Sequence, residues 1–192
     1  DCTATRIEPP LTDYLENSVR AIQGAQRFGA AMIEIDVTPT ADGKFALFHD
    51  AGLDCRTDGH GPTGAQTLAA LQALDAGYGY SADGGKTFPL RGQGQKIASL
   101  EEGLAAAPGT ALLYNFKSAD PAAAERLIAA IKASGRDVIA RHDGFSVPDA
   151  QLARFRAAFP GAWVYSDAAI EACTKGYLLQ GWAKLTLPAP GA

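Results

Sequence analysis

The stretch that decides the fold is LENSVRAIQGAQRFGAAMIEIDVTPTADGKFALFHD, residues 15–50. The apolar residues of its first part recur at helical spacing, which predicts a helix over residues 15–29. Residues 31–37 then alternate apolar and acidic side chains, which is the period of a β-strand with one apolar face. The sequence therefore predicts a helix followed by a strand, and the other face of that strand carries the carboxylates of Glu34 and Asp36.

The residues after this strand indicate a β-hairpin. Asp42 and Gly43 form a turn signal between the strand and a second apolar run, FALFHD. If these two residues are the turn, His49 lies opposite Asp36 with their Cβ atoms about 5 Å apart. Pro39 weakens this register because it lacks a ladder donor, and a slip of one residue moves His49 to the other face. The alternative for His49 is the start of an Asx-type loop at the pair His-Asp.

The rest of the chain falls into two parts. Residues 50–97 are rich in Gly and Asp and contain one clear helix, which ends at Gly77, so we expect an elaborated insertion there. From residue 99 onward, helices and strands alternate. The expected elements are helix 99–107, strand 111–116, helix 121–135, strand 137–145, helix 148–159, strand 162–166, a short helix ending near 173 and an apolar run over 177–187.

This alternation predicts an α/β fold with a parallel sheet, either doubly wound or closed into a barrel. No G-x-G-x-x-G or P-loop sequence follows the first strand, so a nucleotide site has no support and the barrel is favoured. We therefore predict a TIM-type (β/α)8 barrel with the insertion after its second strand. About five strands are visible where such a barrel needs eight. We expect one partial barrel domain over residues 1–192, with both ends of the barrel missing.

Composition and charge argue against several classes of function. The 192 residues include 17 basic and 21 acidic side chains, a net charge of −4, and no basic cluster, which argues against nucleic acid as a partner. No apolar run approaches the roughly 18 residues of a membrane span, so we expect no stable membrane insertion. Cys2, Cys55 and Cys173 lack C-x-x-C spacing, which excludes zinc ribbons and thioredoxin motifs. Their odd number leaves the disulfide state open.

Glu34 and Asp36 point most directly to chemistry. Because they are two residues apart in a strand, their carboxylates lie on one face, about 7 Å apart or less. Like charges this close repel unless a cation lies between them, and Mg²⁺ or Ca²⁺ is the hard, oxygen-binding ion that fits. The alternative is a solvent-exposed strand face with two ordinary acids.

The run from ENSVR to ALDAG, residues 16–77, resembles the glycerophosphodiester phosphodiesterase family. The pattern of that family is an E-N-[TS] helix start, a strand I-E-x-D-V, then T-x-D-G and H-D-x-x-L-x-R-T. The matching elements are Glu16-Asn17-Ser18, Ile33 to Val37, Thr40 with Asp42-Gly43, His49-Asp50 with Leu53, and Arg56-Thr57. A later run, KIASLEEGL, resembles the P-x-L-x-E block of the family with Ala98 in place of Pro. The resemblance is clearest over residues 16–118.

The resemblance implies a metal-dependent barrel phosphodiesterase that cleaves small-molecule glycerophosphodiesters to glycerol 3-phosphate and an alcohol. By position, it implies that Glu34 and Asp36 bind the Mg²⁺ or Ca²⁺ ion. The third metal ligand of the family lies in an E-x-K strand, which here reads Y-N-F-K at 114–117. Asn115 thus takes the ligand position. Lys117 matches the family and lies past Asn115 on the same strand face, where its ammonium can bind a phosphate oxygen of the substrate; the alternative is a solvated residue at a strand end. Because an amide oxygen carries no charge, we expect weaker metal affinity or a water-mediated contact.

The resemblance further implies that His49 is one of two catalytic histidines. The other lies in a His-Arg-Gly motif ahead of E-N-[TS] in the family, and we expect it upstream of Asp1. The second hypothesis is an impaired barrel that binds a phosphorylated ligand without turnover, and the third is a phospholipase D-like phosphodiesterase with another headgroup. The alcohol, the metal ion and the oligomeric state stay open. A periplasmic or secreted location is favoured by the mature-looking start at Asp1-Cys2 and by the substrates of the family.

Overall fold

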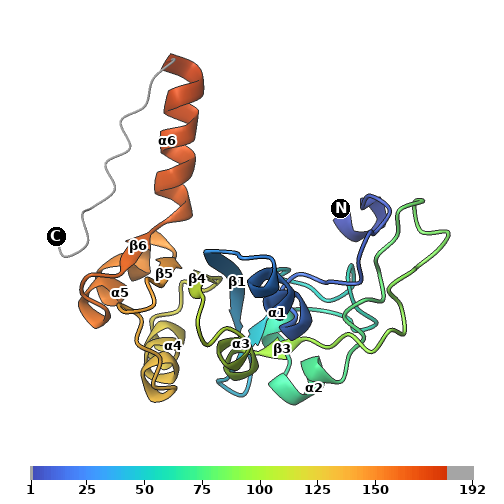
Figure 1. Cartoon of the computed structure of the whole chain (residues 1–192), viewed down its shortest axis with the longest axis horizontal. Coiled ribbons are helices and arrows are strands. Elements are labelled where there is room, and N and C mark those ends of the chain that lie inside the picture. Colours follow the sequence, from blue (N-terminus) through green and yellow to red (C-terminus); the bar gives the residue numbers. More distant parts are fainter. Residues whose placement is uncertain (1, 181–192) are drawn as a thin grey trace. The chain divides into compact units, whose positions relative to one another are not determined.

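The computed structural model describes residues 2–180, and these residues form two compact units (Figure 1). The first unit holds residues 2–30 and 37–108, and the second holds residues 31–36 and 109–180. Strand β1, Met32–Pro39, contributes its first residues to the second unit and its last residues to the first. The other strands of the described residues are β2 Phe45–Leu47, β3 Ala98–Ser99, β4 Ala111–Phe116, β5 Gly144–Ser146 and β6 Trp163–Tyr165. They are ordered β3-β2-β1-β4-β5-β6, so β1 has β2 and β4 as its neighbours.

The first unit contains short elements separated by long loops. In chain order they are η1 Thr3–Arg6, α1 Val19–Arg27, β2 Phe45–Leu47, η2 Thr63–Ala65, α2 Leu68–Gln72, β3 Ala98–Ser99 and α3 Leu100–Ala106. Helix α1 begins at Val19, four residues after the predicted start, because the Ser18 hydroxyl caps it by accepting a hydrogen bond from the Ala21 amide at 3.1 Å. Helices α1 and α3 pack together, and α3 needs Gly103 because a Cβ atom there would collide with the Leu47 side chain.

Strands β1 and β2 form the predicted antiparallel hairpin, but the predicted register is wrong by one residue. Val37 pairs with Leu47, whereas a two-residue turn would pair it with Phe48. The physical reason is a longer turn: the Thr40 amide donates to the Lys44 carbonyl at 3.0 Å, so residues 40–44 form the loop. Because β2 ends at Leu47, the ladder does not place His49 opposite Asp36.

The second unit shows the predicted alternation of strands and helices. Its elements after β1 are β4 Ala111–Phe116, α4 Pro121–Ala133, β5 Gly144–Ser146, η3 Asp149–Gln151, α5 Leu152–Ala158, β6 Trp163–Tyr165 and α6 Asp167–Gln180. Strands β4, β5 and β6 pair in parallel. Four aromatic side chains pack in a buried group between these strands and α5, and they are Tyr114, Phe145, Phe155 and Phe159. Parallel strands joined by helices are the arrangement that the sequence predicts.

Two elements of the second unit differ from their predicted bounds. The strand expected over 137–145 starts only at Gly144, because residues 137–142 turn back on themselves and His142 has a φ of +58°. Helix α6 continues to Gln180, past the expected end near 173. The first four residues of the apolar run predicted at 177–187 belong to this helix, and the remainder lies outside the described residues.

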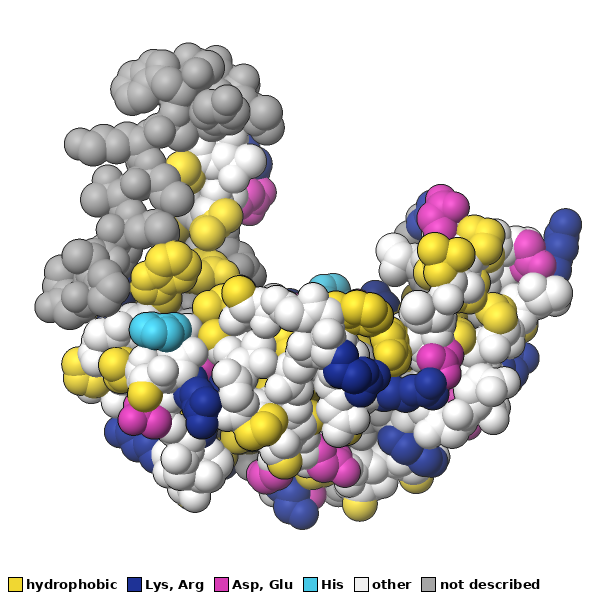
Figure 2. All heavy atoms as spheres, viewed as in Figure 1, with side chains coloured by type: hydrophobic (Ala, Val, Ile, Leu, Met, Phe, Trp, Pro, Cys, Tyr) yellow, Lys and Arg dark blue, Asp and Glu magenta, His cyan; other side chains and the backbone are white. Residues whose placement is uncertain are grey.

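The insertion expected at residues 50–97 contains η2 and α2, and turns, bends and loops make up the rest of it. Charged side chains of both signs lie on the face that Figure 2 shows. Across residues 2–180, no helix is long and apolar enough to cross a membrane.

Candidate active site

The acidic pair lies on β1, within the second unit. Glu34 and Asp36 are two residues apart on this strand, so they share one of its faces. The Asp36 side chain is only 5% exposed. Glu34 is an exposed residue, although protein atoms partly surround its carboxyl group. A buried carboxylate such as that of Asp36 requires partners that offset its charge.

Strand β4 supplies these partners from its carboxyl end. The Asn115 side-chain amide donates from Nδ2 to Asp36 Oδ1 at 3.2 Å, and Lys117 Nζ lies 2.9 Å from the same oxygen. Asn115 also forms a side-chain hydrogen bond with Glu34. The structure thus brings together four of the five predicted site residues, Glu34, Asp36, Asn115 and Lys117, and we call this group the β1/β4 cluster.

The electrostatics of the β1/β4 cluster favour a cation. Burial raises the pKa of the Glu34 carboxyl group, and the neighbouring carboxylate of Asp36 raises it further. The hydrogen bond from Asn115 and the charge of Lys117 lower the same pKa, but the net direction is upward. The cluster therefore resists holding two negative charges, and additional positive charge would stabilise the ionised form of both acids.

The donor atoms of the cluster fit a hard divalent cation through its two acids. Carboxylate and amide oxygens are the ligands that Mg²⁺ and Ca²⁺ prefer. Asn115 directs its donor Nδ2 toward Asp36, so its amide oxygen would face a cation held by the two acids only after the amide group turns over. Among residues 2–180, no three His, Cys, Asp or Glu side chains gather as a metal site. The amide at position 115 stands where a third carboxylate would complete such a group.

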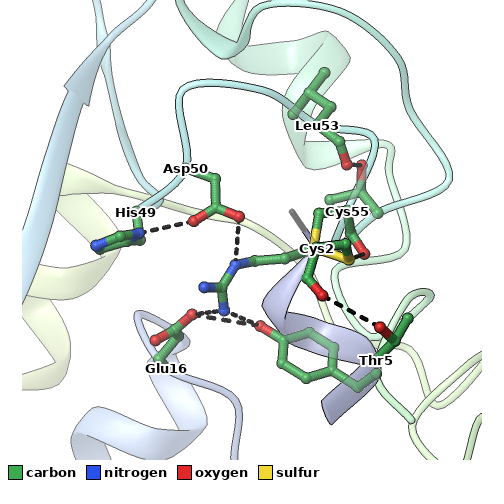
Figure 3. Close-up of a disulfide and its surroundings, with 10 residues drawn as sticks. Cys2, Thr5, Glu16, His49, Asp50, Leu53 and Cys55 are labelled. Atoms are coloured by element: carbon green, nitrogen blue, oxygen red, sulfur yellow. Dashed lines mark hydrogen bonds and ion pairs between the residues drawn. A yellow bond between two sulfur atoms is a disulfide. The ribbon is translucent and has the colours of Figure 1, made fainter. Parts of the chain in front are cut away.

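The fifth predicted residue, His49, belongs to the first unit and to a second polar group (Figure 3). His49 Nδ1 lies 2.7 Å from Asp50 Oδ1, and Arg56 Nε donates to Asp50 Oδ2 at 2.7 Å. Arg56 also donates to the Tyr80 hydroxyl at 2.9 Å and to a carboxylate oxygen of Glu16. Burial alone would raise the pKa of Asp50, but the hydrogen bonds from Arg56 and His49 outweigh burial and lower it. Asp50 is therefore an anion at neutral pH.

Residues 11–151 match the model of the glycerophosphoryl diester phosphodiesterase family. The chain belongs to this family. An uncharacterized protein of Mycobacterium tuberculosis is 30% identical over 132 residues, which are 66% of this chain and 44% of that protein. The glycerophosphodiester phosphodiesterase of Bacillus subtilis is 34% identical over 124 residues, which are 61% of this chain and 41% of that enzyme. The chain thus spans less than half the length of these family members.

Solved structures of the family share the fold. The glycerophosphoryl diester phosphodiesterase domain of an uncharacterized Mycobacterium tuberculosis protein superposes with a TM-score of 0.71 and 23% identity, over 90% of this chain and 62% of that chain. An Oleispira antarctica phosphodiesterase in complex with the product sn-glycerol-3-phosphate gives a TM-score of 0.59 and 26% identity, over 78% of this chain and 58% of that one. The prediction of a partial TIM-type barrel of this family is confirmed.

Sequence reasoning missed the partners of His49. Asp50 and Arg56 belong to the same family motif as His49, H-D-x-x-L-x-R-T. That motif could have indicated that the three side chains lie together. It also missed a disulfide between Cys2 and Cys55, whose Cα atoms lie 5.2 Å apart and whose positions are 53 residues apart (Figure 3). Three cysteines allow three pairings, so spacing alone could not select this one.

Proposed function

We propose that this chain is part of a divalent-metal-dependent enzyme that hydrolyses glycerophosphodiesters to glycerol 3-phosphate and an alcohol. The observation that carries the proposal is the β1/β4 cluster, in which two carboxylates, an amide and an ammonium meet at motif positions of the family. Such a group can bind a cation through its oxygens and a phosphate through its positive charge. The activity named for the Bacillus subtilis relative supports this reaction.

Glu34 and Asp36 would hold the cation, with Oδ1 of Asn115 as a neutral third donor. A bound Mg²⁺ or Ca²⁺ supplies positive charge that offsets the negative charge building on the phosphodiester oxygens. Lys117, which pairs with Asp36 in the structure, would bind a phosphate oxygen as a point charge. The two positive groups would then orient the phosphodiester and stabilise its developing charge.

His49 would serve as an acid-base group through Nε2, because Asp50 occupies its other ring nitrogen. An imidazole changes protonation near neutral pH, so it can take a proton from an attacking oxygen or give one to the leaving alcohol. The other histidines differ in context: His60 and His142 are both exposed residues outside the family motif.

The substrate class follows from the relatives. The Oleispira antarctica phosphodiesterase holds its product sn-glycerol-3-phosphate, which supports a glycerol phosphate moiety on one side of the scissile bond. We therefore propose the glycerophosphodiesters as a class, with a small-molecule substrate.

The experiment is an assay of the protein that carries this chain, with glycerophosphocholine and glycerophosphoethanolamine, in the presence and absence of EDTA. We expect release of glycerol 3-phosphate that stops with EDTA and returns with Mg²⁺ or Ca²⁺. Asp36→Asn and His49→Gln should each abolish most turnover, while His60→Gln should leave it unchanged. Undiminished turnover in EDTA, or in Asp36→Asn, would contradict the proposed role of the cluster.

A second candidate function is an impaired barrel that binds a phosphorylated ligand without cleaving it. Asn115 favours this candidate, because the site then has one carboxylate fewer than the family pattern. Calorimetry with glycerol 3-phosphate distinguishes the two, since binding without any turnover would support the impaired barrel. A third outcome would support the phospholipase D-like alternative. In that case the protein would cleave a phosphodiester with another headgroup but would cleave neither glycerophosphocholine nor glycerophosphoethanolamine.

We also propose that the protein works in the periplasm or outside the cell. The disulfide between Cys2 and Cys55 supports this location, because such bonds persist in oxidising compartments and are rare in the cytosol. Alkylation of free thiols in freshly lysed cells tests the proposal. Cys2 and Cys55 should resist labelling until a reductant is added, and their immediate labelling would contradict it.

A further inference from the structure

The Asp50 carboxylate fixes which nitrogen of His49 bears a proton. His49 Nδ1 and Asp50 Oδ1 are 2.7 Å apart, and an ionised carboxylate can only accept a hydrogen bond. Nδ1 must therefore donate, which leaves the lone pair of the neutral ring on Nε2. The His49 side chain is 51% exposed, so little packing holds the ring itself. The hydrogen bond to Asp50 is thus the main restraint on its orientation.

Asp50 is in turn held at both its side chain and its backbone. Arg56 Nε donates to Oδ2, the carboxylate oxygen that does not face His49, at 2.7 Å. The Asp50 carbonyl accepts a hydrogen bond from the Thr63 hydroxyl at 2.8 Å, and the amide of Thr63 donates to the next carbonyl, that of Ala51, at 2.9 Å. These hydrogen bonds restrain both the rotation of the carboxylate and the movement of its backbone.

Arg56 is the most restrained member of this chain of contacts. Its side chain is only 13% exposed, and it bonds the Tyr80 hydroxyl and the Glu16 carboxylate in addition to Asp50. The Arg56 carbonyl accepts from the Gly79 amide at 3.0 Å, and a Cβ atom at position 79 would collide with the carbonyl of Cys55. The disulfide to Cys2 ties the residue next to Arg56 to the first helical turn of the chain, η1 (Figure 3).

We propose that Asp50 and Arg56 are positioning residues, which hold His49 in the tautomer with the proton on Nδ1 and present Nε2 for proton transfer, and that the Cys2–Cys55 disulfide fixes the backbone from which Arg56 extends. This inference rests on the proposed function only in assigning a catalytic role to His49. The tautomer and the order of the ring follow from the contacts alone. Asp50 and Arg56 do not touch the substrate in this account and act through His49.

The test combines a spectroscopic readout with kinetics on the full protein. Nitrogen-15 NMR of the imidazole side chains distinguishes the two tautomers, and we expect His49 of the wild type to be protonated mainly at Nδ1. Asp50→Asn should shift His49 toward a tautomer mixture and lower kcat by about ten- to a hundredfold, with KM little changed. Arg56→Lys should produce a smaller change of the same kind, because an ammonium keeps the charge but loses the Nε donor.

The chain offers a matched control. His60 Nδ1 lies 3.0 Å from Asp54 Oδ1 in the same loop, but both side chains are highly exposed, and among residues 2–180 no arginine side chain binds the Asp54 carboxylate. Asp54→Asn should therefore change neither the His49 signals nor kcat. Cys2→Ser should shift the His49 tautomer in the same direction as Arg56→Lys.

The outcomes separate this inference from the proposed function. A wild-type His49 protonated mainly at Nε2 overturns the inference without any variant, so a misfolded variant does not decide the matter. An unchanged His49 tautomer in a folded Asp50→Asn protein overturns it as well. If the protein cleaves no glycerophosphodiester but His49 shows the expected tautomer and its loss in Asp50→Asn, the proposed function fails while the positioning role stands.

Discussion

Glu34 is the residue at which folding and the proposed chemistry oppose each other. Burial and the neighbouring Asp36 raise the pKa of its carboxyl group in the folded state above its value in the unfolded chain. A carboxyl group shifted upward contributes most to stability below its unfolded pKa, and the contribution is lost as the pH rises through the folded pKa. Without a cation, the ionised Glu34 therefore works against the folded state at neutral pH.

We predict that Glu34→Gln makes the metal-free protein more stable at neutral pH and flattens its loss of stability with rising pH. The same change should weaken binding of Mg²⁺ or Ca²⁺ by at least about tenfold, or about 1.4 kcal/mol. Urea unfolding in EDTA between about pH 4 and about pH 8 measures the first effect, and calorimetry measures the second. Glu8→Gln, at an exposed position, is the control. A lower stability of the Glu34 variant at neutral pH in EDTA would count against the account.

Position 115 gives the complementary prediction. Asn115→Glu adds a third carboxylate to the β1/β4 cluster, so metal affinity should rise by about tenfold, because ligand charge tunes the affinity of oxygen sites. In EDTA the same variant should be less stable than the parent, since it adds a like charge. Asn115→Gln keeps the neutral amide and serves as control. Equal metal affinity in the parent and the Glu variant would mean that position 115 does not ligate the ion.

Among the elements, the starts of β4 and β5 are joined through Asp143, which directly precedes β5 and belongs to a buried ion pair. Arg136 binds Asp143 with two hydrogen bonds, Nε to Oδ2 at 2.6 Å and Nη2 to Oδ1 at 2.8 Å, and the Asp143 side chain is fully buried. Asp143 Oδ1 also accepts from the Leu112 amide on β4 at 2.8 Å. One carboxylate thus satisfies a strand amide and a buried guanidinium together.

We predict that Asp143→Asn lowers the free energy of unfolding by about 3 to 5 kcal/mol, because it leaves the buried charge of Arg136 without its counter-ion. Denaturant unfolding at neutral pH provides the measurement. Glu125→Gln removes one partner of the more exposed Arg154 pair and should cost less than about 1 kcal/mol. Comparable losses of unfolding free energy in the two variants would show that the buried pair contributes no more to stability than the exposed one.

The elements also show what local sequence can and cannot predict. The alternation in β1 and the apolar run at 111–116 come from neighbouring residues, so β1, α3, β4 and α4 were predicted within about two residues. The ends of α2 and α6 were predicted less well, because α2 stops at Gln72 instead of Gly77 and α6 continues to Gln180. The hairpin register failed because Thr40 and Lys44 close a five-residue loop around the Asp42-Gly43 signal. The prediction of a strand over 137–145 was wrong because these residues begin with a turn, at the end of which Asp143 forms a buried ion pair with Arg136.

Across the whole molecule, the contacts that sequence could not predict are the distant ones. The family motif pointed to Glu34, Asp36, Asn115 and Lys117, and the structure brings all four into one cluster, while their roles stay predictions. Nothing in the spacing of residues shows that Arg56 reaches Asp50, Glu16 and Tyr80, which lie 6, 40 and 24 positions away. Whether His49 and the β1/β4 cluster act on one substrate stays a prediction.

The disulfide gives a prediction at the same scale. Cys2 and Cys55 are 53 residues apart, and a loop of that length implies a stabilisation of about 4 kcal/mol through restriction of the unfolded chain. Cys2→Ser should therefore lower the free energy of unfolding by up to that amount, as measured by urea unfolding without reductant. Adding reductant should bring the wild type to the same midpoint and leave the variant unchanged. A reductant effect of equal size on the variant would contradict this explanation.

The same bond makes a covalent ring of residues 2–55, and Glu34, Asp36 and His49 are all members of that ring. Residues 41, 42 and 44 of the hairpin loop are exposed, which makes this loop a site where a protease can cut. A single cut there opens the ring but releases nothing, because the two pieces stay joined through sulfur. The nicked protein would run as one species without reductant and as two with it.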